Sequence, residues 1–174
     1  MVNQIDAGRL VLAPIFRPVA RMLLDGGTPK ALSFAPGYPS RFSLEVMESV
    51  VDAQEPGRFG PYFMVRKADD MIIGEIGCSV EEASDTGYIG YTVVEPYWGH
   101  GYATEALRAL LAYVLADPRI RRVVAETMVD HAASRRVMEK AGMRQCGARV
   151  DVEDGEQVKL VSYEALATTQ PEAH

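Results

Sequence analysis

Residues 93–106 of this 174-residue chain read VVEPYWGHGYATEA, where an apolar strand runs into a glycine-rich turn and then into a helix. Such a turn leaves several backbone N–H groups unpaired and aimed at one point, and the helix dipole adds partial positive charge there. Gly99 and Gly101 carry no Cβ that would keep a phosphate away, and Thr104 offers a hydroxyl in the first helical turn. The stretch therefore predicts an anion site, and a pyrophosphate is the ligand that fits it.

Three phosphate-binding patterns compete for this turn. A P-loop needs a Gly-Lys-Ser/Thr ending, which is absent, and a dinucleotide fingerprint needs a third glycine where Thr104 stands. This second departure argues against a nucleotide-dependent oxidoreductase. The segment from Trp98 to Ala103 resembles instead the pyrophosphate loop of the GNAT acyltransferase superfamily, Gln/Arg-x-x-Gly-x-Gly/Ala, except that Trp occupies the first position.

Two further segments carry the same resemblance. Residues 130–143, DHAASRRVMEKAGM, are similar to the family's Asn-x-x-Ser/Ala…Glu-Lys-x-Gly-Phe/Met segment, and residues 9–12 (RLVL) are similar to its first strand. The glycine loop followed by residues 104–107 (TEAL) resembles the branch that includes the ribosomal-protein-alanine N-terminal acetyltransferases. The resemblance spans about residues 9–165, and its specific part is residues 93–143.

Hydrophobic periodicity extends the fold prediction to the rest of the chain. Strands are expected at 9–14, 62–66, 72–80, 88–94, 123–128, 144–153 and 157–163, and helices at 19–24, 44–54, 103–116 and 132–141. Ser43 is expected to cap the second helix, and Asp154-Gly155 is a strong type I′ turn signal. With the resemblance, this predicts an α/β (α+β) protein with a mixed, mostly antiparallel, seven-stranded sheet and about four helices on its faces. We expect one domain over residues 1–174, with its core at about 9–165 and a frayed tail at 167–174.

Composition and charge exclude several classes of protein. A formal net charge of −6 argues against general nucleic-acid binding. Apolar runs stay far shorter than a membrane span, and the N-terminus has no secretory pattern, so we expect a cytoplasmic protein. No cluster of His, Cys and carboxylate residues has metal-ligand spacing, so no metal is expected. Cys78 and Cys146 are far apart in sequence, and of the two alternatives, one disulfide or two reduced and buried thiols, we expect the second.

The resemblance implies acetyl-CoA as co-substrate, with its pantetheine arm in a gap between the strands at 88–94 and 123–128. The residues expected to contact it are Val93, Val94, Trp98, Gly99, His100, Gly101, Tyr102, Ala103, Thr104, His131 and Ser134. His131 stands where many relatives carry Asn, and it either contacts the arm or caps the helix that follows. Arg119, Arg121 and Arg122 are expected near the loop's end of the sheet, where they meet the adenosine 3′-phosphate or, as we favour, form a solvated face.

Acetyl transfer to an amine requires a base for the amine and an acid for the departing thiolate. Met138 stands where many relatives carry a tyrosine acid, so Ser134, one helical turn earlier, is the predicted acid. Glu75, Glu126 and a water relay remain alternatives for the base. Tyr88 is a further catalytic candidate, and strand alternation places it on the opposite face from Tyr91.

The predicted function is acetyl-CoA-dependent N-acetylation of a primary amine, on a protein N-terminus or a small molecule. The alternative is a non-catalytic acyl-CoA-binding regulatory module, which the residues at 131 and 138 would suit. Phe34, Tyr38 and Phe42 either shape the acceptor pocket or cover the core. Dimerisation is common among similar proteins, although nothing in this sequence indicates a homodimer.

Overall fold

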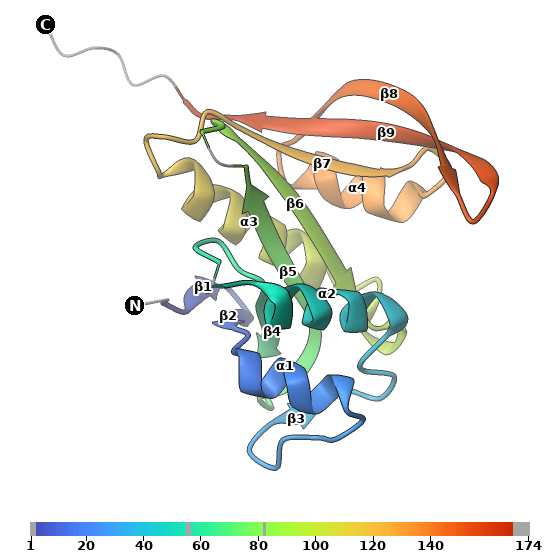
Figure 1. The fold of residues 1–174 in the computed structure, drawn as a ribbon. Helices are drawn as coiled ribbons and strands as arrows, with labels where there is room; N and C mark the ends of the chain where they lie inside the picture. The colour runs from blue at the N-terminus through green and yellow to red at the C-terminus, as the bar shows by residue number, and fades with distance from the viewer. Residues whose placement is uncertain (1–2, 55–56, 82, 169–174) are drawn as a thin grey trace, which may run out of the picture.

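The computed structural model describes residues 3–54, 57–81 and 83–168, which form a mixed sheet covered by helices on both faces (Figure 1). In chain order the elements are β1 (Ile5–Ala7), β2 (Leu10–Pro14), α1 (Arg17–Leu24), β3 (Ser33–Phe34), α2 (Arg41–Asp52), β4 (Tyr62–Arg66), β5 (Met71–Val80), β6 (Thr86–Val93), a 3₁₀ turn (Glu95–Tyr97), α3 (Tyr102–Leu115), β7 (Arg122–Met128), α4 (Ala132–Lys140), β8 (Arg144–Glu153) and β9 (Glu156–Leu166).

The predicted mixed, mostly antiparallel sheet is confirmed. The strand order is β1-β2-β4-β5-β6-β7-β9-β8, with β3 added beside β5, and among the described residues only the β6–β7 and β3–β5 pairings are parallel. All seven predicted strands are present. The sheet has nine strands because β1 and β3 add to them, and segments of three and two residues are too short to display an alternating pattern.

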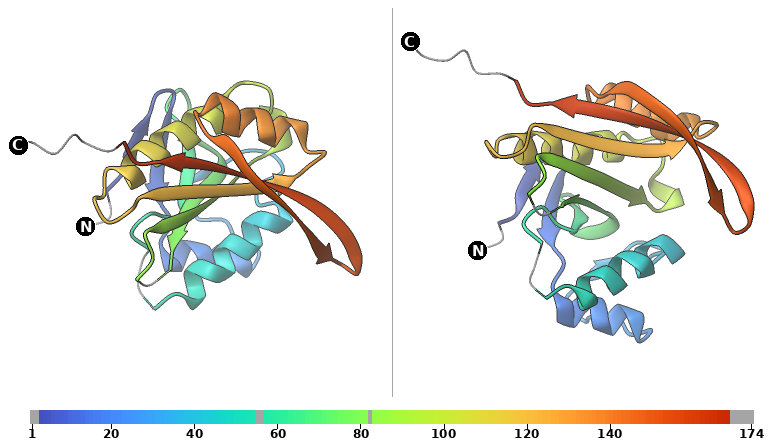
Figure 2. Two further views of the ribbon diagram at one scale, coloured as in Figure 1. Left: turned by 90° about the horizontal axis from the view of Figure 1, so that it is seen from above. Right: turned by 45° about the horizontal axis from the view of Figure 1, so that its top comes forward.

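The four helices divide between the two faces of the sheet. Ala20 and Leu23 of α1 and Met47 of α2 pack on Phe63 and Ile72 in one cluster of buried residues. A larger cluster joins the helices of the other face to the sheet, and its helical members include Leu107, Leu110 and Met138. Figure 2 shows this layering, with α1 and α2 on one side of the strands and α3 and α4 on the other. We call these the α2 face and the α4 face.

Local signals at the element ends were mostly interpreted correctly. Asp154 and Gly155 both have positive φ, as the predicted type I′ turn between β8 and β9 requires. The cap of α2 is Ser40 and not Ser43, because the Ser40 hydroxyl accepts the Ser43 N–H at 3.1 Å. Ser43 is buried in the first turn of the helix, and because Ser40 is the cap, the Ser43 hydroxyl can bond to another partner. The predicted frayed tail at 167–174 lies largely outside the described residues.

The two cysteines differ in burial. Cys78 is buried in β5, as expected, whereas Cys146 is exposed because β8 is the edge strand of the sheet. Both are free thiols.

Candidate active site

The strands β6 and β7 pair over only three positions and then separate. The paired residues are Thr86 with Arg122, Gly87 with Val123, and Tyr88 with Val124. Beyond them β6 stays paired with β5 as far as Val93, and β7 stays paired with β9 as far as Met128. The facing edges of β6 and β7 are therefore open along the second half of each strand, which is the gap that the sequence predicted.

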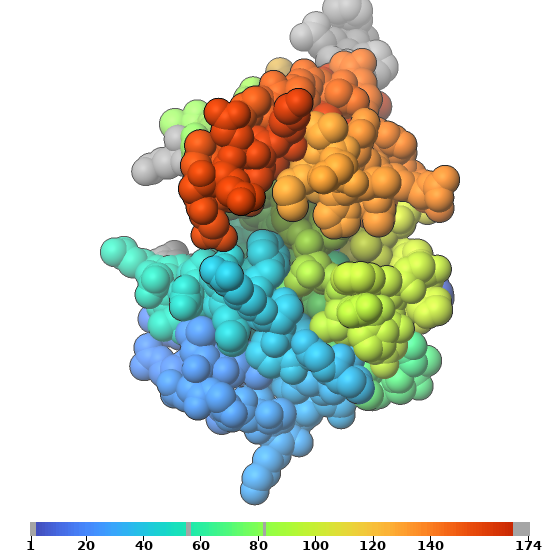
Figure 3. Space-filling model, turned by 90° about the vertical axis from the view of Figure 1, so that its right-hand side faces the viewer, coloured from blue at the N-terminus to red at the C-terminus, as the bar shows by residue number. Residues whose placement is uncertain are grey.

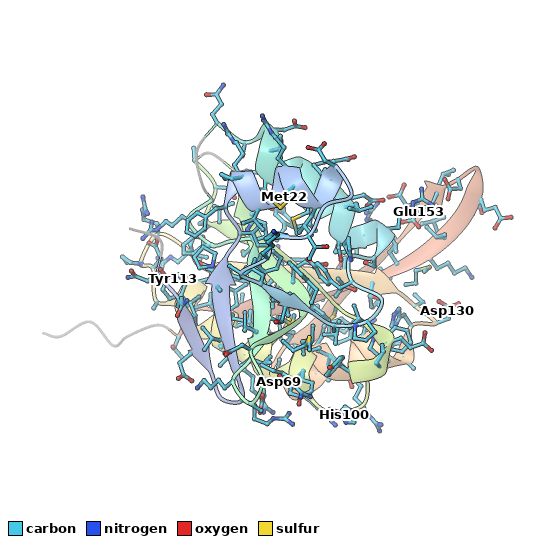
Figure 4. The ribbon with its side chains drawn as sticks, turned by 90° about the horizontal axis from the view of Figure 1, so that it is seen from below. Met22, Asp69, His100, Tyr113, Asp130 and Glu153 are labelled. Atoms are coloured by element: carbon cyan, nitrogen blue, oxygen red, sulfur yellow. The ribbon has the colours of Figure 1, made fainter. Side chains whose placement is uncertain are left out.

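The glycine-rich turn lies at the open end of this gap. Gly99 and Gly101 have φ of 75° and 81°, which glycine adopts without strain, and both are exposed together with His100. Gly101 is the N-cap of α3 and supplies no side-chain cap, so the first amides of the helix have no side-chain partner there. Thr104 is buried beneath this turn. Figure 4 shows His100 at the same end of the molecule as Asp130, which follows β7, and Tyr113 of α3 lies at the other end.

Two arginines contact the turn and the start of α3, and the sequence pattern did not predict either contact. Arg9 donates to the His100 carbonyl (2.6 Å) and to the Glu105 carboxylate (2.9 Å), and its guanidinium lies 4.3 Å from the Tyr102 ring centroid. The Arg66 guanidinium lies 5.9 Å from the centroid of the same ring. The helix start is thus fixed by contacts to the β1–β2 turn and to β4, 36 or more residues away in sequence.

The end of β6 connects the gap to the turn. The Val94 N–H donates to the Ile73 carbonyl (2.9 Å) and the Val94 carbonyl accepts from Tyr97 (3.0 Å), so both Val94 groups are engaged within the protein. Val93 precedes it, and alternation turns its backbone groups toward the gap. The Trp98 indole N–H donates to the Val93 carbonyl. This contact explains what Trp98 does at the first position of the loop pattern: it ties the turn to the last residue of β6.

Two hydroxyl groups meet on the α4 face of the gap. The Tyr91 hydroxyl of β6 lies 3.0 Å from the Ser134 Oγ of α4, and burial raises the pKa of Tyr91. The His131 Nδ1 accepts the Ser134 N–H at 3.1 Å, so His131 caps α4, one of its two predicted readings. Met138 is buried in the core. Tyr91 was not among the predicted site residues, because no local pattern links it to Ser134, 43 positions away.

A buried carboxylate lies on the α2 face of the sheet. Glu75 of β5 is 1% exposed, and the Ser43 hydroxyl donates to its Oε1 at 2.9 Å. Burial raises the pKa of Glu75 to about 7, while the neighbouring hydroxyls of Tyr38 and Ser43 lower it by less. Glu75 Oε2 and the Tyr38 hydroxyl are both buried, and neither has a hydrogen-bond partner among residues 3–54, 57–81 and 83–168, although Tyr38 lies close enough to affect the pKa of Glu75.

Glu75 faces a cavity of about 240 Å³, which we call the Glu75 cavity. Tyr88 and Gly90 of β6 and the exposed Phe42 of α2 also line it. A Cβ on Gly90 would meet nothing within 4 Å, so this glycine leaves open space in the cavity floor. In the space-filling view the surface is hollowed between the orange-red β8–β9 hairpin, the cyan α2 and the yellow-green turn before α3 (Figure 3).

The other candidate base, Glu126, is held in an ion pair. Arg149 of β8 donates to both of its carboxylate oxygens at 2.9 and 2.6 Å, and Ser162 donates at 3.1 Å. The hydrogen bonds from Arg149 lower the pKa of Glu126. Glu126 lies on the same face as Glu75, because Tyr88 links the pairings of β5, β6 and β7 in register. It does not line the Glu75 cavity.

The arginines at 119, 121 and 122 lie at the opposite end of the sheet from the glycine turn, so their predicted placement was wrong. Because β6 and β7 are parallel, α3 returns the chain to the start of β6 before β7 begins. Arg119 pairs with Asp117 (3.1 Å), and Arg122 pairs with Glu164.

The three aromatic residues that the sequence placed in the loop before the second helix lie in different surroundings. Phe34 and Tyr38 stack at 5.2 Å and pack edge-on against Phe63, so they cover the core. Phe42 lines the Glu75 cavity.

The described part of the chain contains neither a metal-binding cluster nor a membrane-spanning helix. There, no group of three His, Cys, Asp or Glu residues is arranged to hold a metal ion. Nor does any helix formed by these residues have the length and apolarity needed to span a membrane.

Comparison with known proteins identifies the family. Residues 9–144 match the model of the acetyltransferase (GNAT) domain. The chain therefore belongs to the GNAT acetyltransferase family.

Individual relatives agree with this assignment. The chain is 28% identical over 106 residues (61% of its length) to the uncharacterized N-acetyltransferase YnaD of Bacillus subtilis, and 32% identical over 85 residues (48%) to the ribosomal-protein-serine acetyltransferase of Escherichia coli. These matches span 62% and 47% of the two relatives, less than two thirds of their lengths. Among solved structures, RimL, a ribosomal L7/L12 alpha-N-protein acetyltransferase in complex with coenzyme A, has a TM-score of 0.74 at 18% identity, covering 97% of this chain and all of that one. That likeness shows a shared fold.

Proposed function

We propose that this protein is an acetyl-CoA-dependent N-acetyltransferase that moves an acetyl group directly to a primary amine in a ternary complex. The observation that carries the proposal is the gap between β6 and β7, with a glycine turn at its open end and proton-handling groups on both faces of the sheet. Relatives named as N-acetyltransferases and a neighbour bound to coenzyme A support it.

The residues around the gap fit coenzyme A. The uncapped amides at the start of α3 suit a pyrophosphate, and Gly99 and Gly101 let it approach the backbone closely. The open edge of β6 offers backbone groups for an extended arm, and the Val93 N–H is the best placed of them, since the Val93 carbonyl already accepts from Trp98. Bound there, the co-substrate supplies an activated thioester.

Glu75 is the proposed general base. A base works best when its pKa lies near the operating pH, and the pKa of Glu75 is about 7. Glu75 lines the Glu75 cavity, and its Oε2, which has no hydrogen-bond partner among the described residues, is the proposed acceptor of the amine proton. The freed nitrogen then forms the C–N bond while the C–S bond breaks. Glu126 is a weaker base because its ion pair with Arg149 lowers its pKa.

Ser134, supported by Tyr91, is the proposed acid. The departing thiolate needs a proton or a hydrogen bond, and the buried Met138 thioether can donate neither. The Ser134 hydroxyl, 3.0 Å from the Tyr91 hydroxyl, can donate to the sulfur while Tyr91 donates to Ser134. Proton donor and proton acceptor thus lie on opposite faces of β6.

The acceptor is a primary amine, on a protein N-terminus or a small molecule, and we propose that it is met in the cytoplasm. One relative is named for acetylating ribosomal-protein serine, which makes N-terminal peptides the first acceptors to test.

The test is calorimetric titration with acetyl-CoA, with NAD as control, followed by thiol release in the presence of amines and N-terminal peptides. Binding of acetyl-CoA with thiol release on one acceptor is the expected result. Binding without release on any acceptor would support the regulatory module instead. Absence of binding would refute the assignment of the glycine turn.

A further inference from the structure

A second, larger cavity adjoins the Glu75 cavity. It has a volume of about 890 Å³ and lies where β5 ends and β6 begins, at the opposite end of β6 from the glycine turn. We call it the distal cavity. The two cavities share five lining residues: Ser49, Gly60, Pro61, Cys78 and Ser79. The shared residues show that the two cavities adjoin each other along α2 and β5.

The distal cavity is lined mainly by apolar side chains. Phe16, Val50, Phe59 and Ile120 are among them, and Phe16 is 56% exposed although it is large and apolar. A ligand with an apolar body covers exposed apolar surface of this kind when it binds in a concave site.

The arginines of the distal cavity are already paired. Arg58 and Arg119 both form ion pairs with Asp117, which is 6% exposed. Asp117 offsets one of these two positive charges, and the carboxylates of Glu81 and Asp85 also line the cavity, so the lining has no excess of positive charge.

The volumes of the two cavities suit acceptors of different length. A cavity of about 240 Å³ holds an amine with a few carbons, whereas sites of roughly 300–1,000 Å³ hold larger ligands. Along β5 the path from Glu75 to Val80, which lines the distal cavity, covers about 17 Å of strand. An acceptor with its amine at Glu75 would need an extended body to fill both cavities.

We propose that the distal cavity binds the apolar body of the acceptor, so that the substrate is a primary amine carried on an extended apolar chain. The inference rests on the proposed function, since it places the reactive amine at Glu75. An alkyl amine and a peptide with apolar side chains share this chemistry, and the experiment separates them.

The experiment compares three acceptors at saturating acetyl-CoA: propylamine, octylamine, and the peptide Ala-Leu-Leu-Leu. Because each buried CH₂ is worth about 0.8 kcal/mol, kcat/KM for the better long acceptor should exceed that for propylamine by at least roughly ten-fold. Preference for octylamine indicates an alkyl body, and preference for the peptide indicates a protein N-terminus. Equal kcat/KM for all three acceptors would overturn the inference and leave the proposed function intact. Thiol release with none of them would instead count against the proposed function.

Substitutions at two neighbouring residues test whether the distal cavity causes the preference for long acceptors. Ala53→Phe puts a large side chain into the distal cavity, and the matched control Gln54→Phe adds the same side chain one residue on, where it lines neither cavity. Ala53→Phe should lower kcat/KM for the preferred long acceptor by about ten-fold and change that for propylamine less than about two-fold. Gln54→Phe should change neither. Phe16→Ala, a truncation at an exposed position, should also weaken only the long acceptor. If Ala53→Phe, verified as folded by thermal melting, acts equally on long and short acceptors, the inference is wrong.

Discussion

The two faces of β6 provide opposite environments for proton transfer. On the α2 face a buried carboxylate has one hydrogen-bonded and one unpaired oxygen, and its pKa is raised to about 7. On the α4 face two hydroxyls, from Tyr91 and Ser134, lie 3.0 Å apart. Residue type alone does not make a good base. Glu126 is also a carboxylate on the α2 face, yet its ion pair with Arg149 lowers its pKa, whereas burial raises that of Glu75.

The largest expected effect tests the α2 face. Glu75→Gln keeps the size of the side chain and an acceptor for Ser43 but removes the base, so kcat/KM should fall about 10²- to 10⁴-fold. Glu126→Gln is the matched control and should change kcat/KM by no more than a few-fold. Thiol release at fixed acceptor measures both. Equal losses in the two variants would erase the distinction between the carboxylates.

The pH dependence sharpens the same contrast. Burial raises the pKa of Glu75 to about 7, and the base must be ionised to act, so kcat/KM falls as pH falls below that value. With one essential proton and half of the base already protonated at pH 7, the loss between pH 7 and pH 5 should be about 50-fold. The same titration in Glu75→Gln corrects for protonation of the amine itself and should lack this limb. A limb near pH 4 in the wild type would point to an unperturbed carboxylate.

The next effect tests the α4 face. Ser134→Ala should lower kcat about 10- to 100-fold, because the thiolate then leaves without a positioned donor. Tyr91→Phe should have a smaller effect in the same direction. If the two hydroxyls act as one unit, the double variant should be no worse than Ser134→Ala alone. Additive losses would mean that each hydroxyl acts by itself.

The glycine turn and the catalytic groups differ in how far the sequence revealed them. The turn is local: residues 98–103 contain the whole pattern, and the structure builds it on the strand and helix that were predicted. The strand pattern could not place Glu75, because the β4–β5 pairing shifts register between Met64 and Val65. Ile72 packs on the α2 face, and strict alternation from it would have put Glu75 on the other face.

Long-range contacts were the other part that local pattern could not supply. Arg9 and His100 are 91 residues apart, and only the folded sheet brings the β1–β2 turn beneath the glycine turn. The same holds for Tyr91 with Ser134. A sequence reports the residue types that chemistry needs, but which of them meet is set by register and by the packing of the helices on each face.

The smallest expected effect concerns the turn itself. Gly101→Ala places a Cβ 3.4 Å from Arg9 Nη2 on a residue with φ of 81°, a conformation that is unfavourable for alanine by roughly 1 kcal/mol. The turn should relax away from its anion-binding shape, so KM for acetyl-CoA should rise about five- to ten-fold while kcat stays within about two-fold. Gly26→Ala is the control, since Gly26 has φ of 78° and open space around it, at the end of α1. It imposes the same backbone strain without touching the turn, so a rise in KM there as well would show that lost stability, and not the shape of the turn, is responsible.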